Sequence, residues 1–289
     1  MNWRRLLMSV VLIMGGSTAN AWELRDDNGQ AVRFDAAPQR IVSLLPSLTE
    51  TVCALGQCAK LVGVDRYSNF PQSVRALPQV GGGLDPQIEA IVALKPDLVL
   101  VSNSSPGVQR MRGLGLKLLA LEPRNFADAT RVVRLLAQVL AVDTATGVVQ
   151  AMERDMRTAV QSVPATARGK SVYFEVNPGP YAAGESSFIG ETLAQLGLKN
   201  IVPASLGAFP KINPELVVRA QPDLILVGDN EVDDLSKRPG WAALSAIRAQ
   251  RICVFDKQDS DTLVRPGPRM ATGAMRVAQC LQRLYPVPS

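Results

Sequence analysis

Residues 125–163 read NFADATRVVRLLAQVLAVDTATGVVQAMERDMRTAVQSV, and we expect the rest of the chain to fold around them. Apolar residues recur at helical spacing in two consecutive blocks, and Asn125 and Asp143 are placed to cap the two helices. We predict that the second helix spans residues 143–163 and ends before Pro164. At about 1.5 Å per residue this helix would be roughly 30 Å long, close to the width of a small domain.

The sequences on either side of this helix resemble each other. Residues 88–102 read IEAIVALKPDLVLVS, and residues 214–228 read PELVVRAQPDLILVG. In one constant register Glu89 matches Glu215, and in both segments a Pro-Asp pair precedes an apolar run. A second pair agrees, with ETVCALG at 50–56 and ETLAQLG at 191–197. We therefore interpret the chain as two related α/β halves joined by one long helix.

Short apolar runs alternate with helical segments in both halves, which is typical of mostly parallel sheets. These predicted strands cover residues 41–45, 61–64, 98–101, 117–121, 172–176, 224–227 and 252–255. The predicted fold class is α/β, with two Rossmann-like lobes. We expect an N-terminal lobe at 22–125, a helical connector at 126–168 and a C-terminal lobe at 169–289.

The first 21 residues have the composition of a secretory signal peptide. Arg4 and Arg5 precede an apolar run at 6–14, and Ala19-Asn20-Ala21 fits a cleavage site. We expect cleavage after Ala21 and a periplasmic chain without a lipid anchor, because no cysteine follows that site. Loss of the two arginines lowers the formal net charge from +5 by two units. The remaining charge is small and dispersed, so no nucleic-acid partner is expected.

Export makes the four cysteines candidates for disulfides. Three pairings are possible. Cys53 and Cys58 lie close together at a predicted helix end, whereas Cys253 and Cys280 fall in the last predicted strand and helix. These positions favour Cys53–Cys58 together with Cys253–Cys280. The spacing matches no zinc pattern, so we expect neither a metal site nor a cofactor.

The composition also bears on catalysis. The chain contains no histidine, which excludes Ser-His-Asp and Cys-His sites. A binding protein is therefore favoured over an enzyme, and the alternative from another class is an exported α/β enzyme whose site lacks histidine. In open α/β sheets ligands lie beyond the carboxyl ends of the strands. Three loops predicted there combine an aromatic or arginine residue with proline or glycine, at 65–71, 177–184 and 259–269.

Three motifs of the first half resemble the helical-backbone substrate-binding proteins of ABC importers, the periplasmic receptors for cobalamin, iron-siderophores and haem. They are RIVSLLPSLTE at 40–50, VGVDRYSNFP at 62–71 and LDPQIEAIVALKPDLVLVS at 84–102. The resemblance extends over essentially the whole mature chain. It implies two lobes joined by one rigid helix with the ligand in the cleft between them. It also implies a monomer that delivers its ligand to an ABC permease dimer with its ATPase subunits.

Within this family, the sequence resembles the cobalamin receptors in particular. The resemblance implies ligand contacts from Tyr67, Tyr181, Phe209, Asp261 and Arg265. The first-lobe tryptophans of cobalamin receptors have no counterpart here around Gly82 or Ser102. The expected ligand is cobalamin or another cobalt corrinoid, and the alternatives are a ferric siderophore and, less favoured, haem.

Both halves carry an acid at the start of the helix before the Pro-Asp pair, namely Glu89 and Glu215. A carboxylate at this position also interacts favourably with the helix dipole. In the resembled family these two glutamates meet arginines on the two permease subunits. The resemblance therefore implies that Glu89 and Glu215 dock the protein onto its permease.

Overall fold

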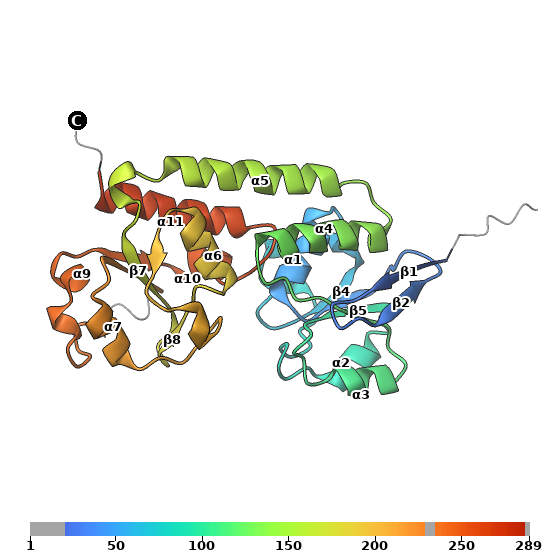
Figure 1. The fold of residues 1–289 in the computed structure, drawn as a ribbon. Helices are drawn as coiled ribbons and strands as arrows, with labels where there is room; N and C mark the ends of the chain where they lie inside the picture. The colour runs from blue at the N-terminus through green and yellow to red at the C-terminus, as the bar shows by residue number, and fades with distance from the viewer. Residues whose placement is uncertain (1–20, 229–234, 287–289) are drawn as a thin grey trace, which may run out of the picture.

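The computed structural model describes residues 21–228 and 235–286. Two α/β lobes lie beneath one long helix, α5 (Ala145–Ser162), which extends over both of them (Figure 1). The predicted signal peptide, apart from Ala21, lies outside the described residues. Within those residues, no helix combines the length and apolar character needed to cross a membrane.

The N-terminal lobe contains a parallel four-stranded sheet in the order β4-β3-β5-β6. Its elements are β3 (Ile41–Ser43), α1 (Pro46–Ala54), η1 (Cys58–Lys60), β4 (Leu61–Val64), η2 (Gln72–Ala76), α2 (Ile88–Ala93), β5 (Leu98–Val101), α3 (Val108–Gly113) and β6 (Leu118–Ala120). An antiparallel hairpin, β1 (Trp22–Arg25) and β2 (Ala31–Phe34), precedes the sheet. Strands β3 and β5 are buried throughout, because helices cover both faces of a parallel sheet, and this explains the uninterrupted apolar sequence of β5.

The C-terminal lobe repeats this order of parallel strands as β9-β7-β10-β11, and β8 pairs with β7 in the antiparallel direction. Its elements are η3 (Ala165–Ala167), β7 (Ser171–Asn177), β8 (Tyr181–Ala182), α6 (Phe188–Gln195), β9 (Lys199–Asn200), η4 (Ala204–Leu206), α7 (Pro214–Ala220), β10 (Leu224–Gly228), η6 (Trp241–Ala243), α9 (Ser245–Arg248), β11 (Ile252–Phe255), α10 (Lys257–Leu263) and α11 (Met270–Leu284). The two sheets therefore share one topology.

Part of the predicted loop at 259–269 is helical. Helix α10 occupies Lys257–Leu263, and the side chain of Asp256 caps it by accepting a hydrogen bond from the Asp259 N–H (2.8 Å). The prolines that suggested a loop, Pro266 and Pro268, follow the helix instead of interrupting it.

The connector begins with α4 (Phe126–Leu140). As predicted, Asn125 caps this helix by accepting a hydrogen bond from the Asp128 N–H (2.7 Å). The predicted cap at Asp143 is wrong, because Thr144 occupies the N-cap position of α5 and the helix begins one residue later. Helix α5 packs mainly on α11, the last helix of the C-terminal lobe, and also on α4, the other helix of the connector.

The internal repeat is visible in the hydrogen bonds of two aspartates. Asp97, before β5, accepts bonds from the backbone N–H groups of Gln39 and Arg40 (2.7 and 2.9 Å), which lead into β3. Asp223, before β10, accepts a bond from the N–H of Ser171 (2.8 Å) at the start of β7. In both lobes, a carboxylate at the entrance of one strand therefore fixes the entrance of its parallel neighbour.

Both favoured disulfides are present in the structure. Cys53–Cys58 ties the end of α1 to η1, and Cys253–Cys280 joins β11 to α11. The Cα atoms lie 4.3 and 5.9 Å apart, respectively. The second bridge fastens the terminal helix to the sheet of its own lobe.

One apolar core extends from lobe to lobe through the helices at the top of Figure 1. It includes Leu48 of α1, Leu136 of α4, Met152 of α5, Val277 of α11 and Phe174 of β7. The opposite faces of the two sheets have separate cores. Among the described residues, the lobes thus share an apolar core on one side of the sheets and have separate cores on the other.

Candidate functional site

The carboxyl ends of the parallel strands carry the loops in which the sequence analysis placed ligand contacts. In the N-terminal lobe, β4 leads into residues 65–71, and in the C-terminal lobe β7 leads into residues 177–184 and β11 into α10. Such strand ends are the usual position of ligands in open α/β sheets. The side chains on these segments therefore define the candidate site.

Tyr67 lies in the loop after β4, and 59% of it is exposed. Its backbone N–H donates to Asp65 Oδ1 (2.8 Å), and its carbonyl oxygen accepts from Arg265 Nη2 (2.9 Å). A Cβ atom at Gly82 would lie 3.4 Å from the Tyr67 ring, so the glycine adjoins the ring without covering it. The ring is therefore accessible, while its backbone is fixed from both sides.

Asp65 is fully buried beneath this loop. Burial raises the pKa of the Asp65 carboxyl, and hydrogen bonds from the Ser68 hydroxyl and the Tyr67 N–H oppose that increase. The Ser68 hydroxyl also lies 2.8 Å from Thr49 Oγ1 on α1. This chain of polar contacts ties the loop to α1 and holds the backbone beneath Tyr67 in place.

Tyr181 and Phe209 lie on adjacent backbone segments of the C-terminal lobe. Tyr181 belongs to β8 and forms a bridge with Lys211, while the Phe209 ring packs against Phe188 with centroids 5.5 Å apart. Tyr181 is 40% exposed and Phe209 is 42% exposed. The structure thus brings these two predicted residues together, and each keeps part of its ring accessible.

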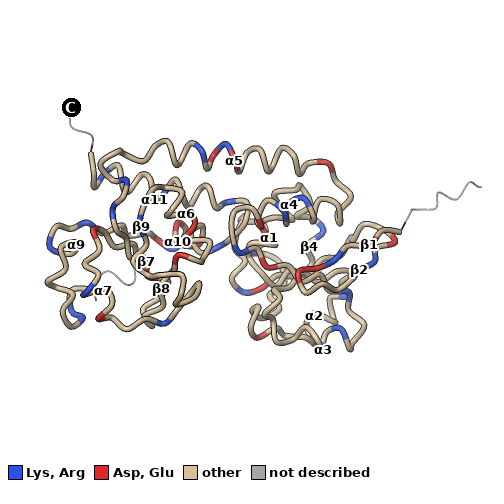
Figure 2. The backbone as a smooth tube through the Cα atoms, in the orientation of Figure 1, with Lys and Arg blue, Asp and Glu red and all other residues tan. Residues whose placement is uncertain are grey.

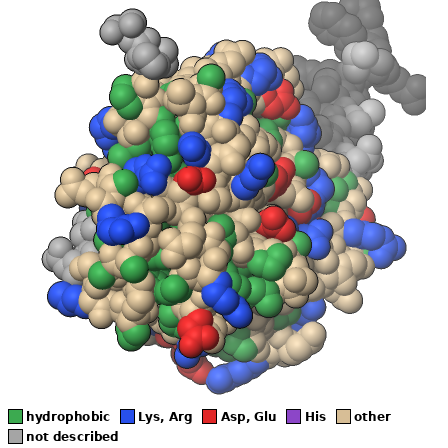
Figure 3. Space-filling view, turned by 60° about the vertical axis from the view of Figure 1, so that its left-hand side comes forward, with side chains coloured by type: hydrophobic (Ala, Val, Ile, Leu, Met, Phe, Trp, Pro, Cys, Tyr) green, Lys and Arg blue, Asp and Glu red, His purple; other side chains and the backbone are tan. Residues whose placement is uncertain are grey.

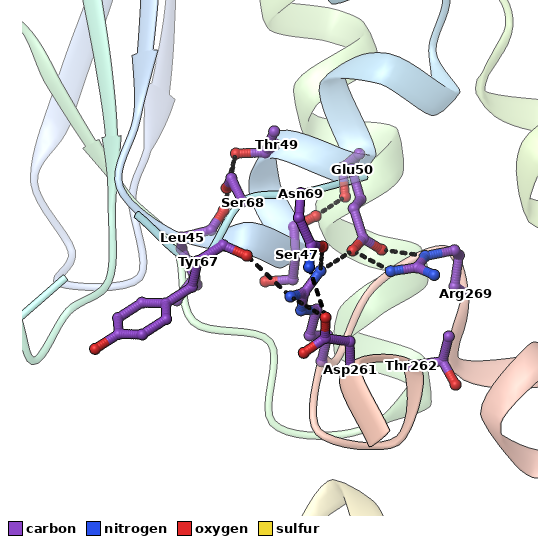
Figure 4. A network of polar contacts seen from close by, with 12 residues as sticks. Leu45, Ser47, Thr49, Glu50, Tyr67, Ser68, Asn69, Asp261, Thr262 and Arg269 are labelled. Atoms are coloured by element: carbon purple, nitrogen blue, oxygen red, sulfur yellow. Dashed lines mark hydrogen bonds and ion pairs between the residues drawn. The ribbon is translucent and has the colours of Figure 1, made fainter. Parts of the chain in front are cut away.

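Asp261 and Arg265 contact the other lobe instead of standing free. Arg265 is buried, and its Nη1 donates to Glu50 Oε1 (2.9 Å) and to Asn69 Oδ1 (2.8 Å) in the N-terminal lobe. Asp261 Oδ2 lies 3.1 Å from Arg265 Nη2 and accepts a hydrogen bond from Asn69 Nδ2 (2.7 Å). The acid–arginine pair therefore joins the lobes, as Figure 4 shows for Asp261 and its neighbours.

Glu50 and Arg269 complete this network, and no sequence pattern predicted that either of them joins the lobes. Arg269 donates from Nε to Glu50 Oε2 (2.8 Å) and from Nη2 to Glu50 Oε1 (2.6 Å). Its guanidinium carbon also lies 3.9 Å from the centroid of the Phe70 ring. We call the following five residues the interlobe cluster: Glu50, Asn69, Asp261, Arg265 and Arg269. Its two carboxylates balance its two guanidinium groups.

A cavity of about 600 Å³ lies at the lobe boundary, beside the interlobe cluster. Its lining includes Phe70, Gln72 and Arg75 of the N-terminal lobe, and Lys257, Gln258 and Arg269 of the C-terminal lobe. A smaller cavity of about 150 Å³ lies where β7, β10 and β11 end. Because both cavities are lined by Lys257 and Asp261, they are adjacent along α10.

Glu89 and Glu215 lie away from this region, in the first turns of α2 and α7. The Glu89 side chain is 79% exposed and accepts a hydrogen bond from Arg110 Nη2 (2.7 Å). Glu215 is also exposed, and its carboxylate forms no ion pair with the residues that the structure describes. Neither acid contacts the candidate ligand site.

Charges of both signs are interspersed along the backbone of both lobes (Figure 2). The face shown in Figure 3 likewise mixes acidic, basic and apolar side chains. Within residues 21–228 and 235–286, no three Cys, Asp or Glu side chains converge to hold a metal ion.

The comparisons with known proteins give consistent results. The model of the periplasmic binding protein family matches residues 41–258. An uncharacterized ABC transporter substrate-binding lipoprotein of Bacillus subtilis is 28% identical over 96% of each chain. A vitamin B12-binding protein of Pectobacterium carotovorum is 26% identical over 87% of this chain and 91% of its own. The crystal structure of a periplasmic heme-binding protein from Pseudomonas aeruginosa aligns with a TM-score of 0.77 at 25% identity, covering 87% of this chain and 94% of that one.

Proposed function

We propose that this chain, which belongs to the periplasmic binding protein family, captures cobalamin or another corrinoid. The family consists of substrate-binding proteins of ABC transporters and is not enzymatic, so a permease and an ATPase are implied as partners. The ligand assignment is supported by the vitamin B12-binding relative, whose similarity covers most of both chains.

The observation that carries the proposal is the neutralisation of arginines at the lobe boundary. Arg265 and Arg269 both pair with the buried carboxylate of Glu50, and Arg66 pairs with Asp85. A ferric catecholate siderophore is strongly anionic and requires cationic side chains that are free to bind it. Guanidinium groups that are already matched with carboxylates do not meet this requirement.

Aromatic rings, in contrast, remain exposed on both lobes. Tyr67 belongs to the N-terminal lobe, and Tyr181 and Phe209 to the C-terminal lobe, each with at least 40% of its surface accessible. A corrinoid presents a broad, partly apolar ring system, which such aromatic faces suit. A ligand that bridges the lobes through these rings would be held without a free charge.

Two alternative ligands, a ferric siderophore and haem, are each supported by one observation. Arg75 is exposed and lines the larger cavity, which favours a ferric siderophore as the runner-up; Lys257 also lines this cavity, but its ammonium lies 3.6 Å from Asp261 Oδ1. The exposed phenol of Tyr67 is a suitable axial ligand for iron, which favours haem less strongly because no histidine is present.

Delivery and location are part of the same proposal. The mature chain acts in the periplasm after loss of its leader, binds its ligand as a monomer, and presents Glu89 and Glu215 to the two permease subunits. The exposure of both acids, one in each lobe, supports this docking role.

Titration calorimetry of the mature chain with cyanocobalamin, a ferric catecholate siderophore and hemin tests the ligand. We expect heat and one-to-one stoichiometry with cyanocobalamin alone. The matched control is Leu114→Ala, which removes an exposed side chain just beyond α3 and should leave the titration unchanged. Tight binding of the siderophore, without heat from any corrinoid, would move the assignment to the runner-up.

A further inference from the structure

We propose that Glu50 is a positioning residue that sets the angle between the two lobes and thereby the placement of Tyr67. Glu50 lies on α1 of the N-terminal lobe and is only 3% exposed. It accepts three hydrogen bonds from two arginines of the C-terminal lobe, all within 2.9 Å. The inference concerns the arrangement of the lobes, so it holds whichever ligand the protein binds.

The charges of the interlobe cluster explain why Glu50 is central to it. Asp261, Arg265 and Arg269 all come from the C-terminal lobe, and together they carry one negative and two positive charges. Glu50 supplies the second negative charge from across the boundary. Without it, Arg265 would keep Asp261 as a partner and Arg269 would have no carboxylate partner among the described residues, so water would have to enter the boundary to solvate the excess charge.

The cluster reaches Tyr67 through Arg265. Arg265 Nη2 donates to the Tyr67 carbonyl oxygen (2.9 Å), and Arg265 Nη1 bonds both Glu50 and Asn69. The other side of Tyr67 is held by its own lobe, where the Tyr67 N–H donates to Asp65. One backbone unit beneath an exposed ring is therefore fixed by both lobes, so a change in the lobe angle must move that ring.

The lobes are connected covalently through α5, so non-covalent contacts between them can restrict their relative rotation. Helix α5 and the shared core hold the lobes together on one side, whereas the opposite sheet faces have separate cores. The interlobe cluster joins α1 and the loop after β4 to α10 and the residues before α11 (Figure 4). It thus adds polar contacts between the lobes at the edge of the shared core, which includes Leu48 of α1 and Leu263 of α10, and these contacts should limit rotation about the helix.

The internal repeat provides a matched control. Glu191 of α6 corresponds to Glu50 in the sequence repeat, but it accepts a hydrogen bond from the backbone N–H of Phe126 (3.1 Å) and not from an arginine. Within residues 21–228 and 235–286 no cation pairs with Glu191, so loss of its charge leaves none of them unmatched. Glu50→Gln and Glu191→Gln therefore remove the same charge at equivalent positions, with different consequences for the lobes.

The interlobe distance can be measured by pulsed electron paramagnetic resonance. Nitroxide labels attached through p-acetylphenylalanine at positions 114 and 206 avoid the four disulfide cysteines, and both positions are exposed, at 57% and 46%. We expect one narrow distance distribution in the otherwise unchanged protein and in Glu191→Gln. In Glu50→Gln we expect a broader distribution with a longer mean distance.

A compensating variant separates positioning from a general loss of structure. Glu50→Gln combined with Arg269→Gln restores charge balance and leaves Arg265 with Asp261, so its distribution should return towards the narrow one. Hydrogen exchange should rise in the segment 65–70 of Glu50→Gln and stay unchanged in the segment 177–184. An unchanged distance distribution in a folded Glu50→Gln, or equal broadening in Glu191→Gln, would overturn the proposal. If Glu50→Gln does not fold, failure of the double variant to give a narrow distribution would overturn it as well.

Discussion

Glu50 and Glu191 occupy matching places in the two halves of the molecule, within ETVCALG and ETLAQLG. Each carboxylate accepts a hydrogen bond from the opposite half of the molecule. Glu50 accepts from Arg269, just before α11, and Glu191 accepts from the N–H of Phe126, the first residue of α4. The donors differ, since one is a pair of guanidinium groups and the other a neutral backbone N–H. The duplicated fold therefore repeats the position of the contact between the halves, whereas in the described part of the chain its donors are charged at Glu50 and neutral at Glu191.

The largest expected effect is on stability. Glu50→Ala leaves two nearly buried arginines without their shared carboxylate, so we expect a loss of about 3–5 kcal/mol in the free energy of unfolding. Glu191→Ala removes an acceptor from a backbone N–H, and its loss should be about 1 kcal/mol. Urea unfolding followed by circular dichroism compares the two variants. Equal losses would show that the two contacts stabilise the fold equally, which would contradict the difference proposed between Glu50 and Glu191.

The next effect concerns the ligand, which should touch both lobes. Tyr67→Ala and Tyr181→Ala each remove one exposed ring, and we expect each to weaken cyanocobalamin binding by about tenfold, which corresponds to about 1.4 kcal/mol. Because the rings lie on different lobes, the losses should add in the double variant. Calorimetry with Leu114→Ala as control measures this. A loss confined to one lobe would show that the ligand does not bridge the boundary.

The two exposed acids Glu89 and Glu215 differ in their partners, because Glu89 is paired with Arg110. We expect a smaller effect from changing them. Exposed charges mainly affect orientation and association rate. We expect Glu89→Ala and Glu215→Ala to keep ligand affinity and folding but to lower uptake of radiolabelled cyanocobalamin, with the double variant worse than either. Arg110→Ala, which frees the Glu89 carboxylate, is the control and should not lower uptake. Lost ligand binding with intact transport would place these acids in the site or the fold.

The smallest expected effect is a pH dependence from Asp65. Burial raises the pKa of its carboxyl above the ordinary value of 3.8, so the folded protein takes up this proton at a higher pH than the unfolded chain does. The resulting stabilisation grows as the pH falls from the raised pKa towards 3.8, and it is absent at pH values above the raised pKa. As the pH falls through that window, the unfolding free energy of the unaltered protein should therefore rise relative to that of Asp65→Asn. A constant or opposite difference would contradict a raised pKa.

Much of the fold could be predicted because its signals are local. The helical periodicity and cap of α4, the apolar strand runs, and the repeated Pro-Asp pairs all appear within short windows of sequence. The two-residue strands β8 and β9 carry no such pattern, because tertiary pairing with β7 forms them. Helix α10 was missed because its polar sequence is followed by two prolines, and its cap at Asp256 lies outside the segment that was predicted to be a loop.

The site was harder to predict because its contacts are distant in the chain. Arg265 pairs with Glu50 across 215 positions, and no local pattern reports that partner. The family resemblance implied that Asp261 and Arg265 touch the ligand, which stays a prediction, and it did not indicate the interlobe contacts that both residues make in the structure. The one available signal for Glu50 was an acid amid apolar residues in both copies of the repeat. An inward-facing carboxylate of this kind requires a partner.

The corrinoid assignment is tested most directly by native mass spectrometry of the mature protein mixed with equal amounts of cyanocobalamin, a ferric catecholate siderophore and hemin. The exposed rings on both lobes and the neutralised arginines between them predict a single one-to-one complex with the mass of cyanocobalamin. A complex with the siderophore or with hemin, and none with cyanocobalamin, would contradict the account.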